Sequence, residues 1–208
     1  MELGRFIALE GGEGAGKSTQ ARLLANALRA REILVVLTRE PGGTPGAEAI
    51  RALLLDPPGE GWGAPAEALL FAAARADHVA RTIRPALASG QWVISDRFLD
   101  SSRAYQGVAR ALGDESVRSL HAIGSAGLLP DLTIVLTAAA AGAAARLRAR
   151  DGDATDAIGG RGAAYHARVV DAFAAFARTE PDRFAVIDGE GTVGEVHDRV
   201  LAAVLARC

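Results

Sequence analysis

The sequence predicts an α/β fold in which a five-stranded parallel sheet carries helices on both faces. Five short apolar runs alternate along the chain with segments whose apolar residues recur at helical spacing. Runs that are mostly apolar suit strands buried on both faces, and alternation of strands with helices suits parallel pairing. With 208 residues, the chain has the size of one compact domain.

The first half of the chain contributes three of the expected strands. Residues 5–10 form a short apolar run that ends in a glycine-rich turn. Residues 33–38 are rich in β-branched side chains and stop at the breaker cluster R-E-P-G-G. Residues 91–95 form the third run. Apolar residues at helical spacing predict helices over 18–31, 45–54 and 65–88.

The second half contributes strands over 132–136 and 184–188. Residues 151–162 are rich in glycine and aspartate and show no periodicity, which predicts a mobile loop rather than a packed element. We therefore expect a single domain over 1–208 with a mobile lid over about 146–162. Helices are expected over 102–110, 114–125, 139–150, 163–178 and 193–206.

Composition excludes several classes of function. A net charge of −2 offers no polycationic surface for bulk nucleic acid. The single cysteine, Cys208, rules out a disulfide framework and a Cys/His metal cluster. The N-terminal residues lack the features of a signal peptide, and no uninterrupted apolar run reaches the roughly 18 to 20 residues of a membrane helix. We expect a soluble, cytoplasmic protein without a membrane partner.

Residues 11–18 read G-G-E-G-A-G-K-S and match the phosphate-loop pattern G-x-x-x-x-G-K-[ST] between an expected strand and an expected helix. In such loops backbone N–H groups and the helix N-terminus surround phosphate oxygens, the lysine reaches the β- and γ-phosphates, and the serine can ligate Mg²⁺. ATP or GTP binding with Mg²⁺ follows. The residues expected to hold the nucleotide are Gly11, Gly12, Glu13, Gly14, Ala15, Gly16, Lys17, Ser18 and Thr19.

Lys17 is the only lysine among 23 basic residues, and this narrows the class. Guanine recognition by GTPases uses an Asn-Lys-x-Asp segment, which needs a second lysine. Partition-type ATPases carry another lysine early in the loop, where this chain has Gly12. Small kinases remain.

Over nearly its whole length the sequence resembles the bacterial thymidylate kinases, which are P-loop nucleoside monophosphate kinases. The most specific matches are T-R-E-P-G-G-T at 38–44 and S-S-R-A-Y-Q-G at 101–107. The resemblance implies phosphoryl transfer from ATP to dTMP with Mg²⁺, and a homodimer. The other matches are E-G-G-E-G-A-G-K-S-T at 10–19, R-A-L-L-L-D at 51–56, L-F-A-A-A-R at 70–75, D-R-F at 96–98 and P-D-L-T at 130–133.

The resemblance implies a catalytic set around the loop. Asp96 ends an expected strand, where it would hold Mg²⁺ together with Ser18, and Arg97 would meet the transferred phosphoryl group. Glu13 would address the sugar 3′-hydroxyl of the monophosphate. The residues expected to be catalytic are Lys17, Arg97, Asp96, Arg150 and Glu13.

The resemblance implies that Arg39 and Arg51 bind the acceptor phosphate, and arginine suits this role because its fork binds two oxygens at once. By resemblance, Glu40 would orient these two arginines, and Pro41 belongs to the same acceptor segment.

The thymine base is expected to lie against Phe71 and Arg75, which share a helix face and supply a ring and a donor for a carbonyl group. Ser102, Tyr105 and Gln106 resemble residues that contact base and sugar. The Tyr105 ring would stand where a ribose 2′-hydroxyl would clash, which favours a deoxynucleotide.

Lid arginines are expected to complete catalysis, because family members with glycine at the position of Gly14 rely on them. Three precede the expected mobile loop 151–162 and one ends it, but Ala157 replaces the arginine usual in the family. We expect Arg150 or Arg161 to take over, and only two of the preceding three can share a helix face. Those three are Arg146, Arg148 and Arg150.

Two other readings are compatible with a phosphate loop. One is a kinase on the same fold that acts on another monophosphate or on a sugar, against which the T-R-E-P-G-G segment argues. The other is a nucleotide-binding regulatory module without turnover, against which Lys17, Asp96 and Arg97 argue. No role is expected for His78, His121, His166 or His197.

Overall fold

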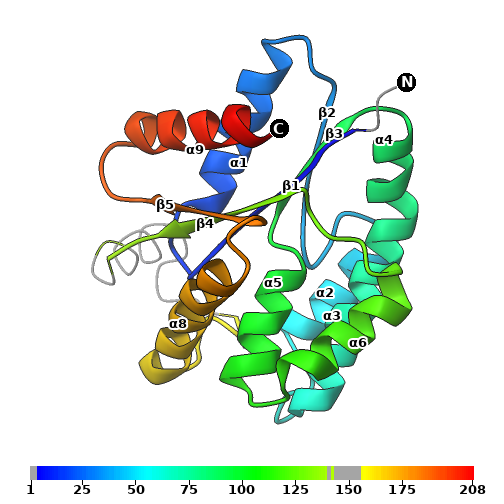
Figure 1. The fold of residues 1–208 in the computed structure, drawn as a ribbon. Helices are drawn as coiled ribbons and strands as arrows, with labels where there is room; N and C mark the ends of the chain where they lie inside the picture. Colours follow the sequence, from blue (N-terminus) through cyan, green and yellow to red (C-terminus); the bar gives the residue numbers. More distant parts are fainter. Residues whose placement is uncertain (1–3, 140–141, 143–155) are drawn as a thin grey trace.

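The computed structural model describes residues 4–139, 142 and 156–208 and shows the predicted parallel sheet (Figure 1). Five strands lie in the order β2-β3-β1-β4-β5, and every neighbouring pair is parallel. Each strand begins and ends within two residues of its predicted bounds. The strands are β1 Phe6–Gly11, β2 Val35–Arg39, β3 Trp92–Asp96, β4 Leu132–Thr137 and β5 Phe184–Asp188.

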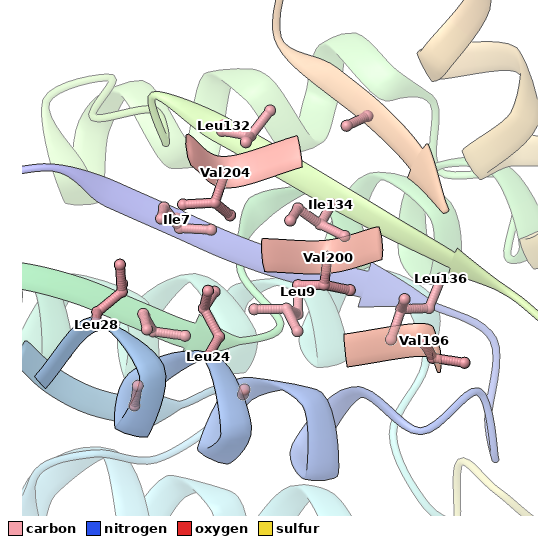
Figure 2. Packing of buried hydrophobic residues seen from close by; sticks show 14 of the residues in the cluster. Ile7, Leu9, Leu24, Leu28, Leu132, Ile134, Leu136, Val196, Val200 and Val204 are labelled. Carbon is pink, nitrogen blue, oxygen red and sulfur yellow. The ribbon is translucent and has the colours of Figure 1, made fainter. Parts of the chain in front are cut away.

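Helices cover both faces of this sheet because side chains alternate along each strand. On β1, Ile7 and Leu9 pack with α1 (Lys17–Arg29) and α9 (Val193–Arg207), whereas Phe6 and Ala8 belong to a separate core. Figure 1 shows helices on both sides of the sheet. Figure 2 shows one of these cores. The described helical elements are α1 Lys17–Arg29, α2 Pro45–Leu55, α3 Ala64–His78, η1 Val79–Ile83, α4 Arg84–Ala88, α5 Leu99–Ser102, η2 Arg103–Ala109, α6 Asp114–Ser125, α8 Ala163–Thr179 and α9 Val193–Arg207.

The core in Figure 2 joins the first and last helices of the chain to the same face. Leu24 and Leu28 of α1 lie beside Val196, Val200 and Val204 of α9, all against the apolar side chains of the central strands. Each of these five side chains is buried, and burial of a Val or Leu side chain contributes roughly 1.5–3 kcal/mol. This packing fixes the start of α1, and with it the phosphate loop.

Two predicted helices contain π-helical turns. The segment predicted over 65–88 consists of α3, η1 and α4 in succession, and the N–H of Arg84 bonds five residues back to Val79. Pro85 has no N–H to donate to the preceding turn, which accounts for the change of pattern there. The segment predicted over 102–110 begins earlier, at Leu99, and η2 is π-helical. Such turns are frequent at functional sites.

The segment 156–162 differs from the prediction of an unpacked loop. Asp156 accepts hydrogen bonds from the backbone N–H groups of Ile158 and Gly159 at 2.9 and 2.7 Å. Ile158 is buried beside Tyr165 and Phe173. The N–H of Ala157 also donates to the carbonyl oxygen of Leu55 at 3.2 Å, so the segment is packed against its neighbours. The remainder of the expected lid, and the expected helix 139–150 apart from residues 139 and 142, lie outside the described residues.

Within the described part of the chain, we find no helix that combines the length and the apolar character needed to cross a membrane.

Candidate active site

A cleft of about 600 Å³ opens at the carboxyl ends of β1, β2 and β3. Ligands in sheets of this kind bind at these ends. From the phosphate loop, the lining includes Glu13, Gly14, Gly16, Lys17, Ser18 and Thr19. From the other segments, the predicted residues that line it are Arg39, Glu40, Pro41, Arg51, Phe71, Arg75, Asp96, Arg97, Ser102, Tyr105 and Gln106.

The phosphate loop links β1 to α1 and packs tightly against the sheet. Gly11 has φ +137, and a Cβ there would lie 2.4 Å from the carbonyl oxygen of Leu136, so only glycine fits. Lys17 donates from Nζ to the carbonyl oxygens of Gly12 at 2.7 Å and of Gly11 at 3.1 Å. Burial and the positive charge of Arg97 lower the pKa of Lys17 to about 8.

Ser18 and Asp96 place two hard oxygen ligands side by side. The Ser18 hydroxyl, at the start of α1, donates to the Asp96 carboxylate at the end of β3. Mg²⁺ prefers oxygen ligands and is commonly held by one or two protein groups together with phosphates and water. No group of three or more His, Cys, Asp or Glu side chains in the described ranges is placed to hold a metal without such help. The pair therefore fits a magnesium ion that arrives with a nucleotide.

Arg97, Glu13 and Tyr105 form a hydrogen-bonded triad on one wall. Arg97, whose φ is +72, donates from Nη2 to Glu13 Oε1 at 2.5 Å and to the Tyr105 hydroxyl at 3.2 Å. Tyr105 donates to the same Glu13 oxygen at 3.1 Å. The Arg97 guanidinium lowers the pKa of Glu13 to about 2. Burial lowers the pKa of Arg97, but Glu13, Tyr105 and the other nearby carboxylates together outweigh it and raise that pKa above its usual range. Both groups stay charged at neutral pH.

Glu10, to which the sequence analysis gave no role, holds this wall from behind. It is fully buried at the end of β1 and accepts from the backbone N–H of Phe98 at 2.8 Å and of Ser101 at 3.0 Å. Ser101 in turn accepts from Arg97 at 3.1 Å. Burial and the charge of Asp100 raise the pKa of Glu10 to about 7. The sequence feature that could have indicated this role is a single acidic residue at the end of an otherwise apolar strand.

The partners of Glu40 correct one prediction. Glu40 does not orient Arg39 and Arg51: Arg39 bonds Glu48 at 3.0 Å, and Arg51 donates to the carbonyl oxygen of Pro41 at 2.8 Å. The Glu40 side chain is buried, whereas the Arg39 side chain is 55% exposed, so the two point in different directions from adjacent positions.

Glu40 instead pairs with α3. Arg75 donates from Nε to Glu40 Oε2 at 2.7 Å, and His78 Nδ1 lies 3.0 Å from Glu40 Oε1. His78 Nε2 lies 2.7 Å from the Thr38 hydroxyl. Burial raises the pKa of Glu40, but the charges and hydrogen bonds of Arg75 and His78 together outweigh it, and the net shift is downward. His78, expected to have no role, is therefore part of the support for Arg75. The sequence feature that could have indicated this is the spacing of three residues between Arg75 and His78, which places both side chains on one helix face.

Arg75 is held on its other side as well. Its Nη2 donates to the Ser102 hydroxyl at 2.8 Å and to the Phe98 carbonyl oxygen at 3.2 Å. Phe71, one turn earlier on α3, is half-buried and lines the same part of the cleft. A fixed guanidinium beside an accessible ring is an arrangement that can hold a flat, carbonyl-bearing base.

The lid arginines divide into two groups. Arg161 does not line the cleft: it donates to Glu67 at 2.5 Å and to the Tyr165 hydroxyl at 2.7 Å, beside a second cavity. The expectation that Arg161 could act in catalysis is thus wrong for this arrangement, because a buried carboxylate binds it elsewhere. Arg146, Arg148 and Arg150 lie outside the described residues.

The chain is similar in sequence and in structure to proteins that share one description. A sequence model described as "Thymidylate kinase" matches residues 9–200. A "Thymidylate kinase" of Rhizorhabdus wittichii is 59% identical over 202 residues, which cover 97% of both chains. One of Rhodopseudomonas palustris is 48% identical and covers 98% of this chain and 90% of the relative. The crystal structure of thymidylate kinase from Ehrlichia chaffeensis superposes with a TM-score of 0.80 at 30% identity, covering 97% of this chain and 99% of the other.

Proposed function

Because the chain belongs to the thymidylate kinase family and is an ATP-dependent dTMP kinase, we propose how its cleft binds the two nucleotides and transfers the phosphoryl group between them. The donor, ATP, lies on the phosphate loop, and the acceptor, dTMP, lies between β2, α3 and η2. The observation that carries this assignment is that one cleft joins the loop around Lys17 to Arg39, Arg51, Phe71 and Arg75.

On the donor side, Lys17 leaves the loop carbonyl oxygens and binds the β- and γ-phosphates, whose charge outweighs the two neutral acceptors. Backbone N–H groups of the loop and the N-terminus of α1 bind the remaining oxygens. Ser18 and Asp96 would hold a Mg²⁺ ion, which when bound neutralises charge on the phosphates.

On the acceptor side, Arg39 and Arg51 bind the phosphate of dTMP beside Pro41. Desolvation and the nearby Arg39 lower the pKa of Arg51, as expected for two cations that share a site for an anion. The 3′-hydroxyl of the sugar bonds Glu13. The Tyr105 ring occupies the space that a ribose 2′-hydroxyl would need.

The base lies on the Phe71 ring, with Arg75 donating to a carbonyl oxygen and Gln106 meeting the adjacent ring nitrogen. Ser102 and Glu40 act through Arg75, whose guanidinium they hold.

The transfer forms a bond from a dTMP phosphate oxygen to the γ-phosphorus and breaks the bond from that phosphorus to the β–γ bridging oxygen. The products are dTDP and ADP. The attacking oxygen is already anionic, so catalysis needs positioned positive charge and no general base. Lys17 and Arg97 supply that charge. Arg150 adds more positive charge when the lid of this single domain, about residues 146–162, closes over the cleft.

We propose further that the enzyme is a homodimer that works in the cytoplasm. Exposed apolar side chains on two neighbouring helices support the first point, since Leu69 of α3 and Ile123 of α6 are 56% and 84% exposed. Light scattering on the purified protein tests it: a mass of one chain would rule the dimer out.

A coupled ADP-release assay with dTMP, dUMP, CMP and AMP tests the function. We expect dTMP to have the highest kcat/KM. A preference for AMP would indicate another nucleoside monophosphate kinase, and no ADP with any acceptor would indicate a regulatory module.

A further inference from the structure

Glu67 lies just outside the cleft, and its carboxylate accepts hydrogen bonds from three side chains. It is in the first turn of α3, and its side chain is 4% exposed. Arg161 and Arg110 donate to its Oε2 at 2.5 Å each. Its Oε1 accepts from Gln106 Nε2 at 2.8 Å and from Arg161 Nη1 at 3.2 Å. Burial raises the pKa of Glu67, but the hydrogen bonds from Arg161 and Gln106 and the charges of both arginines together lower it, so the carboxyl stays ionised.

An ionised carboxylate settles which way the Gln106 amide points, because it accepts hydrogen bonds and cannot donate them. The amide nitrogen of Gln106 must face Glu67, and its oxygen must face the other way. Gln106 is 1% exposed and lines the cleft, and no described protein atom donates to its Oε1. Buried polar atoms nearly always have a partner, so a ligand in the cleft is the expected donor.

We propose that Glu67 is the positioning residue for base selection: it locks Gln106 as a hydrogen-bond acceptor, so that the cleft accepts a pyrimidine with a ring N–H and rejects cytosine. Thymine and uracil carry an N3–H donor beside the O4 acceptor, which match Gln106 Oε1 and the donor Arg75. Cytosine carries an acceptor at N3 and an amino group at C4, and it mismatches at both positions. This inference rests on the proposed placement of the base.

Glu67→Gln reverses the lock at nearly constant volume. The Oε2 position accepts both short arginine bonds, so the oxygen of the new amide stays there and its NH₂ group takes the Oε1 position. There it faces Gln106, and only the longer bond of 3.2 Å from Arg161 Nη1 is lost with it. Gln106 then turns its own oxygen toward residue 67 and presents its NH₂ group to the cleft. That group repels the N3–H of thymine and uracil and suits the N3 of cytosine.

The measurement is kcat/KM for dTMP, dUMP and dCMP with the purified variant, beside its thermal melting curve. A mismatched buried hydrogen bond is expected to lower the value for dTMP about tenfold to a hundredfold, mainly through KM. The value for dUMP should fall in parallel, since it shares the imide edge. The value for dCMP should stay level or rise, while Arg75 still opposes its amino group. The dTMP-to-dCMP ratio therefore narrows at least tenfold.

Two further variants separate base selection from a loss of stability. Arg110→Gln removes another partner of Glu67 and leaves the bond between Glu67 and Gln106. Its dTMP-to-dCMP ratio of kcat/KM should therefore stay within about twofold of the ratio of the unmodified enzyme. Glu67→Met offers neither donor nor acceptor and frees Gln106 to turn, so it should also narrow the ratio, and it serves if Glu67→Gln fails to fold.

An unchanged ratio in whichever of the Glu67 variants folds, or an equal loss for all three acceptors, would overturn the inference. Failure of the unmodified enzyme to phosphorylate dTMP would instead overturn the proposed function.

Discussion

Replacing Lys17 with arginine tests whether the only lysine of the chain is required by the shape of the phosphate loop. Its Nζ lies between the carbonyl oxygens of Gly12 and Gly11, at 2.7 and 3.1 Å, and the side chain is buried. Arginine keeps the charge but carries a larger planar head that cannot occupy the place of a compact ammonium. A misplaced cation at this position removes a contact to the transferred phosphoryl group worth about 3 kcal/mol, or roughly 150-fold in kcat.

The assay is ADP release at saturating dTMP and ATP, together with a thermal melting curve. Arg22→Lys is a matched control, because it makes the reverse exchange at an exposed position on the same helix and should change neither quantity. A kcat for Lys17→Arg within threefold of the unmodified enzyme would refute the reasoning and would make the survival of this lysine accidental.

Three more substitutions test the support of the cleft. His78→Phe removes the bond to Glu40 and loosens Arg75, so the KM for dTMP should rise about tenfold with little change in kcat. His78→Asn is the control, because its amide can replace Nδ1 and should leave the KM unchanged. Equal KM values for the two variants would contradict this role of His78. Glu10 has a pKa raised from 4.5 to about 7, so its ionisation destabilises the fold fully above pH 7 and not below pH 4.5. Glu10→Gln should therefore stabilise the fold more at pH 8 than at pH 5, with a difference in the free energy of unfolding of at most about 3 kcal/mol. Melting curves at the two pH values measure this, and an equal rise in melting temperature at both would count against it. Arg150→Ala should lower kcat at least about tenfold with little change in dTMP affinity, and equal loss of both, or no loss, would exclude Arg150 from catalysis.

The sheet could be predicted from the sequence because its signals are local. Each strand is an apolar run bounded by glycine, proline or charged residues, and the run at 184–188 was predicted with its observed bounds. The phosphate loop was equally local, because its glycines, lysine and serine are consecutive.

Contacts between distant segments account for the differences. Ile158 packs beside Tyr165 and Phe173, and nothing in the glycine-rich sequence around it indicates that α8 and η2 would offer it a place. The π-helical η2 likewise depends on what it packs against, since helical spacing alone does not distinguish its turns from α-helical ones.

In the site, residue identity was predictable and pairing was not. The acidic and basic residues that line the cleft were found from their motifs, but a carboxylate such as Glu40 has several arginines within reach of its loop. The buried position of Arg75 on α3, and the exposed position of Arg39, decide which one it bonds. Glu67 was missed because its partners, Gln106 and Arg161, are 39 and 94 residues away.

The crystal structure of the enzyme with dTMP and a non-hydrolysable ATP analogue tests the central claim most directly. We predict the thymine ring on Phe71, its N3–H bonded to Gln106 and its O4 to Arg75, with the phosphate of dTMP at Arg39 and Arg51 and the triphosphate at Lys17. A thymine base bound away from Phe71, or the two nucleotides in separate cavities, would contradict the account.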